Sequence, residues 1–195
     1  MKIYGDRISG NCLKVKWVCD HLALPYTWHD IDIMKGESRT ADFLKLNPWG
    51  QVPTIVLDDG RSLAQSNAII GYLARGSDLI PQDAFAAAKT DEWLFWEQYS
   101  HEPYIAVCRF HAVYLGKGIA GLDPEKVRRG YLALDHMERR LEVARFLVDD
   151  FSLADVALLA YTRLAHEGGF ELGRYPALRR WISDAEKFLG LPPAR

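Results

Sequence analysis

The sequence is poor in cysteine. Its 195 residues include three cysteines, Cys12, Cys19 and Cys108, with neither a C-x-x-C pair nor the spacing of a metal site. Such a set does not form a disulfide framework, so we expect free thiols, no metal and a reducing compartment. The first residues also lack the apolar core of a secretion signal, and a cytoplasmic location is the simplest expectation.

Strong charge of one sign and long apolar runs are also missing. The 24 Lys and Arg and the 26 Asp and Glu leave a formal net charge of −2. This balance, with no long basic run, argues against nucleic acid or an anionic membrane surface as a partner. No apolar run approaches the roughly 18 residues that a membrane-spanning helix needs. What remains is an ordinary globular composition, long enough for one large domain or two small ones.

The first 76 residues alternate between strand and helix patterns. Ser66 is expected to be the N-cap of the last helix, because its hydroxyl can accept from a free backbone N–H. Together the segments predict an α/β domain with the order βαβαββα. The predicted segments are a strand at 2–4, a helix at 11–24, a strand at 26–33, a short helix at 40–47, a hairpin at 54–64 and a helix at 66–75.

After a polar linker at 77–84, no strand pattern remains, and the sequence predicts an all-helical second domain at 85–195. Ser152 and Asp155 have the spacing of a capping box, in which each side chain accepts from the other residue's backbone, and Phe151 and Val156 are placed for a hydrophobic staple. The predicted helical stretches cover 82–117, 123–148, 152–167 and 176–188.

Three motifs in this order carry a family resemblance: "NPWGQVPTIV" before the hairpin, "QSNAIIGYLA" after it and "FSLADVALLAY" in the helical part. With the βαβαββα order, they make almost the whole chain resemble the cytosolic glutathione S-transferases. The resemblance implies a thioredoxin-like domain followed by an all-α domain, and a homodimer. It also implies glutathione as co-substrate, whose thiolate is conjugated to a small hydrophobic electrophile.

The resemblance places one end of glutathione on two motifs. Pro53 would follow a cis peptide bond, with the main chain of Val52 pairing with the cysteinyl part of glutathione. Gln65 and Ser66 would hold the γ-glutamyl end, where the start of a helix offers free N–H groups and a positive dipole end. The alternatives are a trans proline at a strand start and a Ser66 that only caps its helix.

The glycine carboxylate at the other end of glutathione needs a cation or an amide donor. Lys35, Arg39 and Gln51 are the candidates in the loop before the third strand and next to Val52. Family members often carry lysine where Gln51 stands, so one charge is missing here. A solvated surface position is the alternative for Lys35 and Arg39.

Glutathione chemistry requires a thiolate. Lowering a thiol pKa by about two units takes about 2.7 kcal/mol. One hydrogen bond to the charged sulfur supplies about 1.5–3 kcal/mol, and a helix amino terminus adds about 0.3–1 kcal/mol. One hydroxyl donor at the start of a helix is therefore sufficient.

The turn "SGNC" after the first strand offers three candidates for this donor. Ser9 stands where delta-like and theta-like family members have their serine. Asn11, two residues later, resembles the asparagine of the bacterial nu-like class and is also a plausible N-cap. Cys12 lies near the position of the cysteine in the beta-like and omega-like classes, but two or three residues later in the chain. Our order is Ser9, Asn11, Cys12.

In the helical domain, Tyr104, Cys108 and His111 share one helix face by their spacing and are candidates for the second-substrate pocket.

Two other functions remain open. One is glutathione-dependent reduction of disulfides or hydroperoxides. The other is a non-enzymatic interaction scaffold, which has no need of the ligand-gripping residues Ser9, Pro53, Gln65 and Ser66.

Overall fold

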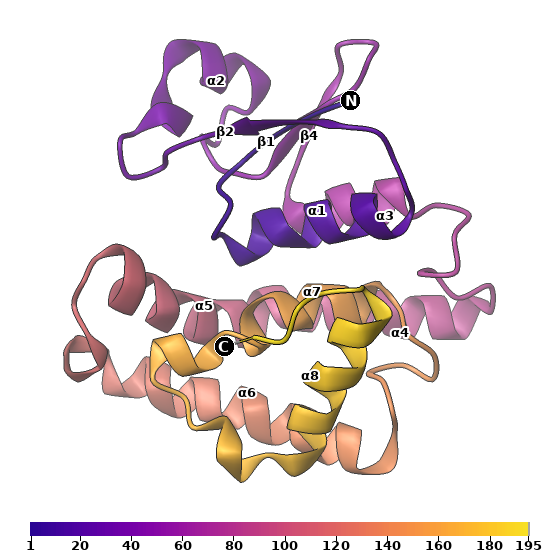
Figure 1. The fold of residues 1–195 in the computed structure, drawn as a ribbon, viewed down its shortest axis with the longest axis vertical. Coiled ribbons are helices and arrows are strands. Elements are labelled where there is room, and N and C mark those ends of the chain that lie inside the picture. The colour runs from indigo at the N-terminus through magenta and orange to yellow at the C-terminus, as the bar shows by residue number, and fades with distance from the viewer. Residues whose placement is uncertain (195) are drawn as a thin grey trace. The chain divides into compact units, whose positions relative to one another are not determined.

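The computed structural model describes residues 1–194, and its chain divides into two compact units, Met1–Ser77 and Asp78–Arg195. We call them the amino-terminal unit and the helical unit and describe each by itself (Figure 1). The sequence predicted a first domain ending at residue 76 and a linker over 77–84. The first helix of the helical unit begins at Ala84.

The amino-terminal unit contains a four-stranded sheet with the strand order β2-β1-β3-β4. β1 pairs parallel with β2 and antiparallel with β3, and β3 pairs antiparallel with β4. This arrangement confirms the thioredoxin-like βαβαββα prediction. The elements are β1 Lys2–Gly5, α1 Gly10–His21, β2 Thr27–Asp30, the 3-10 helix η1 Glu37–Arg39, α2 Ala41–Leu46, β3 Thr54–Val56, β4 Ser62–Ala64 and α3 Ser66–Leu73.

The two faces of the sheet follow from the alternation of residues along β1. Ile3 is fully buried on the same face as Gly5, where a side chain on Gly5 would collide with Trp28 and approach Cys12 of α1. The small residue therefore lets α1 pack closely on the end of β1, and α1 and α3 lie side by side (Figure 1).

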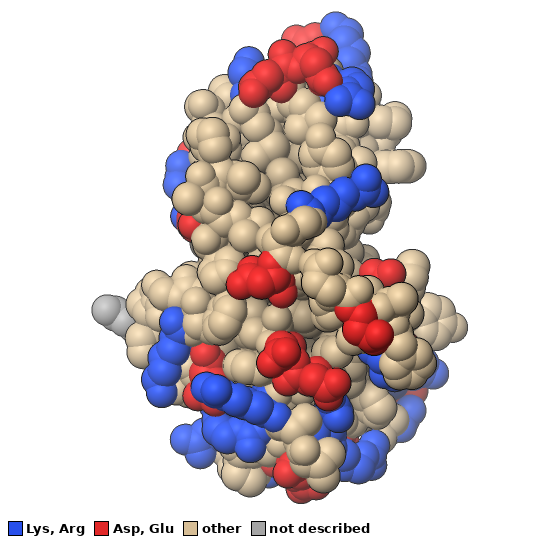
Figure 2. All heavy atoms as spheres, turned by 90° about the vertical axis from the view of Figure 1, so that its right-hand side faces the viewer, with Lys and Arg blue, Asp and Glu red and all other residues tan. Residues whose placement is uncertain are grey.

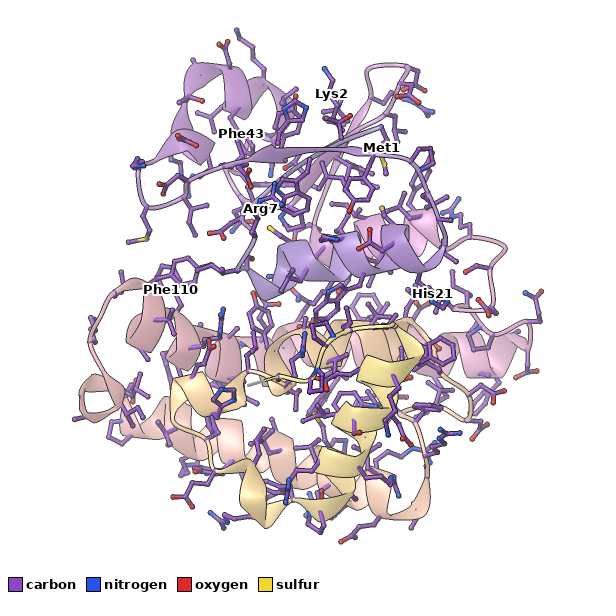
Figure 3. All side chains as sticks on the ribbon, viewed as in Figure 1. Met1, Lys2, Arg7, His21, Phe43 and Phe110 are labelled. Carbon is purple, nitrogen blue, oxygen red and sulfur yellow. The ribbon has the colours of Figure 1, made fainter. Side chains whose placement is uncertain are left out.

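The opposite face of the sheet is covered by α2. Tyr4 stacks on His29 of β2 with ring centroids 4.8 Å apart. Phe43, labelled in Figure 3, comes from α2 and meets the Tyr4 ring edge-on at 6.3 Å. Strand β2 ends at Asp30, earlier than predicted, because the Asp32 carboxylate accepts from the next backbone N–H groups and turns the chain.

The helical unit is all-α, as predicted, but its first long helix is not continuous. Two π-helical turns interrupt the stretch predicted as one helix over 82–117, and a π-turn shifts the helix face because it holds more residues per turn. The elements are α4 Ala84–Trp96, the π-turn η2 Glu97–His101, α5 Glu102–Arg109, the π-turn η3 Phe110–Tyr114, the 3-10 helix η4 Ile119–Gly121, α6 Pro124–Val143, α7 Leu153–Thr162, the 3-10 helices η5 Ala165–Gly168 and η6 Leu172–Arg174, and α8 Pro176–Phe188.

Two predicted helices end early. The prediction of a helix over 123–148 was wrong beyond Val143, where the Arg140 guanidinium instead binds the carbonyls of Leu147 and Val148 in an irregular segment. The helix predicted over 152–167 is α7, which ends at Thr162 and is followed by η5.

Helix α7 forms the centre of the helical unit, with all ten of its residues buried. The predicted capping box is present between Ser152 and Asp155. Asp155 is also buried and accepts further hydrogen bonds from the Leu147 N–H at 3.0 Å and from Trp181 Nε1 of α8 at 2.7 Å. One carboxylate therefore joins α7, α8 and the segment before α7.

The surface carries charges of both signs. On the face shown in Figure 2, acidic and basic side chains are interspersed among uncharged ones. Among the described residues, none of the helices combines the length and apolarity needed to span a bilayer.

Candidate functional site

The candidate site in the amino-terminal unit begins at the turn between β1 and α1. Ser9 is the N-cap of α1, but its side chain makes no capping hydrogen bond. Its hydroxyl instead hydrogen-bonds to the sulfur of Cys12, which also accepts from the Asp6 N–H at 3.3 Å. The Ser9 hydroxyl is therefore already a donor to sulfur in this turn.

Cys12 itself is a buried thiol. Burial raises its pKa to about 12, although the hydrogen bonds from Asp6 and Ser9 oppose this shift. A thiol with such a pKa is protonated near neutral pH and is a poor nucleophile. This leaves Ser9 and Asn11 as the candidates for contact with a glutathione sulfur.

Asn11 connects this turn to the second candidate motif. It is the second residue of α1, so the alternative that it serves only as an N-cap was wrong. Its Oδ1 accepts a hydrogen bond of 2.9 Å from the Ser66 hydroxyl, at the start of α3. The amino-terminal ends of α1 and α3 are thus joined side chain to side chain.

Ser66 is the first helical residue of α3, and the N-cap is Gln65. The prediction of Ser66 as N-cap was wrong, because Gln65 adopts φ 69° and ψ 112° and helical geometry begins only after it. A non-glycine residue in this region costs about 1–3 kcal/mol, and such residues cluster at ligand-binding sites. The side chain of Gln65 and the first N–H groups of α3 lie together at this position.

The Val52–Pro53 peptide bond is cis, as the resemblance implied. The loop before it is held by Asn47, a buried residue that the sequence analysis did not single out. Asn47 Nδ2 donates to the Gln51 carbonyl at 2.8 Å, and its Oδ1 accepts from the Trp49 N–H at 3.1 Å. The asparagine at the start of "NPWGQVP" was the available signal, since its side chain can bond to the turn that follows.

The three residues predicted for the glycine carboxylate differ in their contacts. Lys35 is exposed, and its Nζ lies 3.0 Å from Oδ2 of Asp32. This pairing agrees with the alternative of a solvated surface position. Arg39 Nη1 donates to the Trp49 carbonyl at 2.9 Å, and this contact fixes the guanidinium beside the loop that carries Gln51. The Gln51 side chain is exposed.

Lys14 is a further residue of this region to which the sequence analysis gave no role. It is 0% exposed, and its Nζ lies 3.4 Å from Oδ1 of Asn67 in α3. The signal was its position on α1, where it shares the buried stripe with Val15 and Val18. A lysine in such a stripe is unusual because burying its charge is costly.

The predicted second-substrate residues lie in α5 and in the π-turn η3 of the helical unit. Tyr104 is directed at α6, where its hydroxyl accepts from Arg129 Nη1 at 2.9 Å. Cys108 is 1% exposed, and burial raises the pKa of its thiol. His111 lies in the π-turn η3, beyond the point where regular α-helical spacing stops. Their role in binding a second substrate stays a prediction, although the π-turn changes the spacing that places His111 on the face of Tyr104 and Cys108.

A pocket of about 270 Å³ lies elsewhere on the helical unit. Its apolar lining comes from α5, η3 and α7 and includes Phe110, which is labelled in Figure 3 and stacks on Tyr114. Two polar side chains, Gln98 and Glu102, lie at its side. The lining residues are Gln98, Glu102, Pro103, Ala106, Val107, Phe110 and Tyr161.

Residues 1–194 bring no three His, Cys, Asp or Glu side chains together in a group able to hold a metal ion. The polar groups of the candidate site are hydroxyl and amide groups at the starts of two helices, and the loop before the cis proline is held by Asn47. Together, the sheet topology, the cis proline and the all-helical second unit define a thioredoxin-like domain followed by a helical one.

Comparison with known proteins identifies the family. Residues 8–75 match the family model described as "Glutathione S-transferase, N-terminal domain". Glutathione S-transferase theta-1 of Mus musculus is 31% identical over 97% of this chain and 84% of its own length. Glutathione S-transferase 3 of Zea mays is 32% identical over 80% of this chain and 73% of its own length.

Solved structures agree. The glutathione S-transferase of Pseudomonas fluorescens superposes with a TM-score of 0.90 at 44% identity, over 95% of this chain and 94% of that one. A possible glutathione S-transferase of Rhodopseudomonas palustris gives 0.93 at 37% identity, over 98% and 96% of the two chains. The chain belongs to the glutathione S-transferases, an enzyme family.

Proposed function

We propose that this protein binds glutathione in its amino-terminal unit and transfers it to small apolar electrophiles. The observation that carries the proposal is the hydrogen bond between Asn11 and Ser66. It joins the helix start proposed to face the sulfur to the helix start proposed to hold the γ-glutamyl end. One bound tripeptide could therefore contact both.

In this proposal the first N–H groups of α3 and the side chain of Gln65 bind the γ-glutamyl end. Ser66 is 5% exposed and its hydroxyl already donates to Asn11, so the backbone N–H groups of α3 are the better donors to a carboxylate. Val52 contributes its main chain before the cis proline, and Arg39 and Gln51 are the donors for the glycine carboxylate. Lys35 would have to leave Asp32 to take part.

The reaction follows from the donors at the start of α1. The thiol loses its proton to solvent, and the thiolate is stabilised by the Ser9 hydroxyl, with the Asn11 amide as the second candidate. The sulfur then attacks an electrophilic carbon, forming a carbon–sulfur bond while the leaving group departs with its electron pair. In this proposal the Ser9 hydroxyl turns from Cys12 to the incoming sulfur.

The pocket of about 270 Å³ on the helical unit is our candidate for the electrophile. Its volume is just below the usual range of about 300–1000 Å³ for small-molecule sites, so it suits a small substrate. Phe110 and Tyr161 provide apolar surface for a flat ring. The physiological electrophile is of this class, a small apolar molecule with a reactive carbon.

We also propose a homodimer in a reducing compartment such as the cytoplasm. Phe95 and Tyr99, four residues apart on α4 and η2, are 77% and 84% exposed. Large aromatic side chains exposed close together are typical of protein interfaces. The three free, buried cysteines are compatible with a reducing environment.

Binding and activity separate the candidate functions. Calorimetry with glutathione should show saturable binding, and the protein should conjugate glutathione to an activated aryl halide. If the protein binds glutathione and reduces a mixed disulfide or hydroperoxide, but does not conjugate, the reductase function is favoured. The feature that supports this alternative is the Asn11 amide, which is proposed to lie beside the sulfur. If glutathione does not bind at all, the proposed function is wrong and the scaffold is left.

A further inference from the structure

Arg7 is an exposed residue of the turn between β1 and α1, and its guanidinium is fixed by two residues of β2 (Figure 3). Its Nε lies 2.7 Å from Oδ1 of Asp30, and its Nη2 donates to Oδ2 of the same carboxylate at 3.1 Å. The guanidinium also lies over the ring of Trp28, 5.6 Å from its centroid. Trp28 Nε1 donates to Asp30 Oδ1 at 2.8 Å. We call Arg7, Trp28 and Asp30 the arginine clamp.

The arginine clamp differs from an ordinary surface ion pair. An exposed pair of flexible side chains contributes little, unless a bidentate geometry or a network restricts both partners. Here both carboxylate oxygens accept from one planar guanidinium, which also stacks on an indole. The indole is fixed in turn, because it donates to Asp30 and lies against Gly5, which has no side chain. The Arg7 guanidinium, and after it the Trp28 N–H, lower the pKa of Asp30, so the carboxylate keeps its charge near neutral pH.

The arginine clamp fastens a turn that core packing does not hold. Arg7 is exposed, and the next residue, Ile8, is 49% exposed. Within the turn the Ser9 N–H donates to the Asp6 carbonyl at 3.2 Å, which closes the turn on itself but not on the sheet. Because both partners of Arg7 belong to β2, its side chain ties the exposed part of the turn to the sheet.

Ser9 lies between this turn and α1, so both determine where its hydroxyl points. Its backbone is extended, with φ −73° and ψ 123°, and its side chain makes no capping hydrogen bond. On its carboxyl side the conformation is set by α1, whose first residue, Gly10, is buried. On its amino side the conformation is set by the turn that Arg7 fastens. A group misplaced by about 1 Å can cost a reaction about 100-fold, so a donor to sulfur depends on both sides.

We infer that Arg7 is a positioning residue for the Ser9 hydroxyl, and that the arginine clamp keeps this hydroxyl aimed at the glutathione sulfur. The inference rests on the proposed function, which assigns Ser9 to the thiolate. Arg7 acts through the turn and not through its charge, because the Asp30 carboxylate balances that charge. It therefore serves ionisation of the thiol rather than binding of the tripeptide.

The first test compares Arg7→Met with Arg61→Met. Arg61 forms a similarly exposed pair with Asp59 at 2.6 Å, in the hairpin between β3 and β4. Arg7→Met should raise the thiol pKa of bound glutathione by about 0.5–1 unit, less than Ser9→Ala, because the hydroxyl is displaced and not lost. Arg61→Met should leave this pKa unchanged. The thiolate absorbance across a pH titration measures it in each variant.

Asp30→Asn separates a positioning role from a direct effect of charge. This variant breaks the bidentate pair but leaves the positive charge of Arg7 unopposed. If Arg7 positions Ser9, the thiol pKa should rise as in Arg7→Met, and the double variant should raise it no further than either single variant. A fall of the thiol pKa in Asp30→Asn would show that the charge acts directly and would overturn the inference. Asp30→Asn also provides the test if Arg7→Met does not fold.

Two further measurements distinguish positioning from general damage to the site. S-methylglutathione has no thiol, so Arg7→Met and Asp30→Asn should bind it with the affinity of the wild type; an equal loss of affinity for this ligand would overturn the inference. Arg7→Lys keeps the charge but not the bidentate geometry, and should restore only part of the thiol pKa.

The outcomes also separate this inference from the proposed function. If Ser9→Ala raises the thiol pKa and neither Arg7→Met nor Asp30→Asn does, the role of Arg7 is wrong and the proposed function stands. If Ser9→Ala leaves the thiol pKa unchanged, Ser9 is not the donor and the role of Arg7 is overturned with it. If the wild type binds neither glutathione nor S-methylglutathione, the proposed function itself is wrong.

Discussion

The Ser66 hydroxyl donates a hydrogen bond of 2.9 Å to Asn11, 55 residues earlier in the chain. This bond ties α3 to α1 at the end of both helices where glutathione is proposed to bind. We expect Asn11→Ala and Ser66→Ala each to reduce the free energy of unfolding. A double-mutant cycle should give a coupling of about 0.5–1.5 kcal/mol, the usual net value of such a bond.

Asn11→Asp is the matched control for this pair. It keeps an oxygen that accepts from Ser66 but loses the amide donor, so stability should be closer to the wild type than in Asn11→Ala. If the coupling is zero, the two side chains do not act together in solution.

Ser9→Ala tests the thiolate donor. Removing the hydroxyl takes away one hydrogen bond to a charged sulfur, so the thiol pKa of bound glutathione should rise by about 1–2 units, as about 1.5–3 kcal/mol implies. The ultraviolet absorbance of the thiolate, followed across a pH titration, measures this directly. An unchanged titration would assign the role to Asn11, and Asn11→Ala should then produce the shift.

The cysteines should be unreactive in the folded protein. Burial raises the pKa of both Cys12 and Cys19 to about 12, and that of Cys108 is raised for the same reason. At pH 8 a thiol with a pKa of 12 is ionised in about one molecule in ten thousand. Iodoacetamide should therefore leave the native protein unmodified by mass spectrometry and label all three cysteines in urea.

The same shifts predict how stability changes in alkali. The folded protein holds the protons of these thiols more tightly than the unfolded chain, whose thiols ionise near the ordinary value of 9.0. Stability should then fall as the pH rises above about 9. Cys19→Ala should weaken this fall, and rapid alkylation of Cys12 in the native state would contradict its burial.

Asp155 should be the most sensitive acidic residue of the helical unit. Asp155→Asn places an amide among the N–H donors of Leu147, Ser152 and Trp181. We expect the free energy of unfolding to drop by about 2–4 kcal/mol, since buried donors lose their acceptor. Urea denaturation measures it, with the exposed Asp150→Asn as control, which should stay within about 0.5 kcal/mol of the wild type.

The pH dependence of stability gives a second readout for Asp155. Burial raises its pKa to about 6, so the folded state binds this proton more tightly than the unfolded chain. The wild type should lose this part of its stability as the pH rises from about 4 to about 6, and Asp155→Asn should lack that slope. The same slope in both proteins would assign the titration to another group.

The proposed dimer is tested on its exposed aromatic residues. Phe95→Glu and Tyr99→Glu place a charge on the patch without disturbing buried packing, and each should shift the protein from dimer to monomer in sedimentation velocity. Phe85→Glu, on the same helix and 75% exposed, tells whether the patch extends to the start of α4. If the wild-type protein sediments as a monomer, the proposed homodimer is wrong.

Much of the fold could be predicted from local patterns, because strands and helices have different apolar periods and helix starts have recognisable caps. The βαβαββα order and the Ser152–Asp155 capping box follow from residues within a few positions of one another. The cis bond before Pro53 was implied by the family resemblance. These features were found without knowing which segments meet in space.

The candidate site was predicted only in part. The sequence identified Ser9, Asn11 and Ser66 as polar residues near helix starts. It could not predict the hydrogen bond between Asn11 and Ser66, because the two residues are 55 positions apart and no local pattern connects them. It could not show that Gln65, with a positive φ, is the N-cap of α3 in place of Ser66. It also did not reveal the two π-turns, which change the helical spacing on which the choice of Tyr104, Cys108 and His111 was based.

The sequence by itself therefore determined the order of the elements, the Ser152–Asp155 capping box and the family to which the chain belongs. Tertiary structure alone decided which polar side chains meet, which thiols have their pKa raised by burial and that Lys14 is buried against α3. The physical reason is that hydrogen bonding and desolvation depend on distances between segments, whereas periodicity and capping depend on neighbours along the chain.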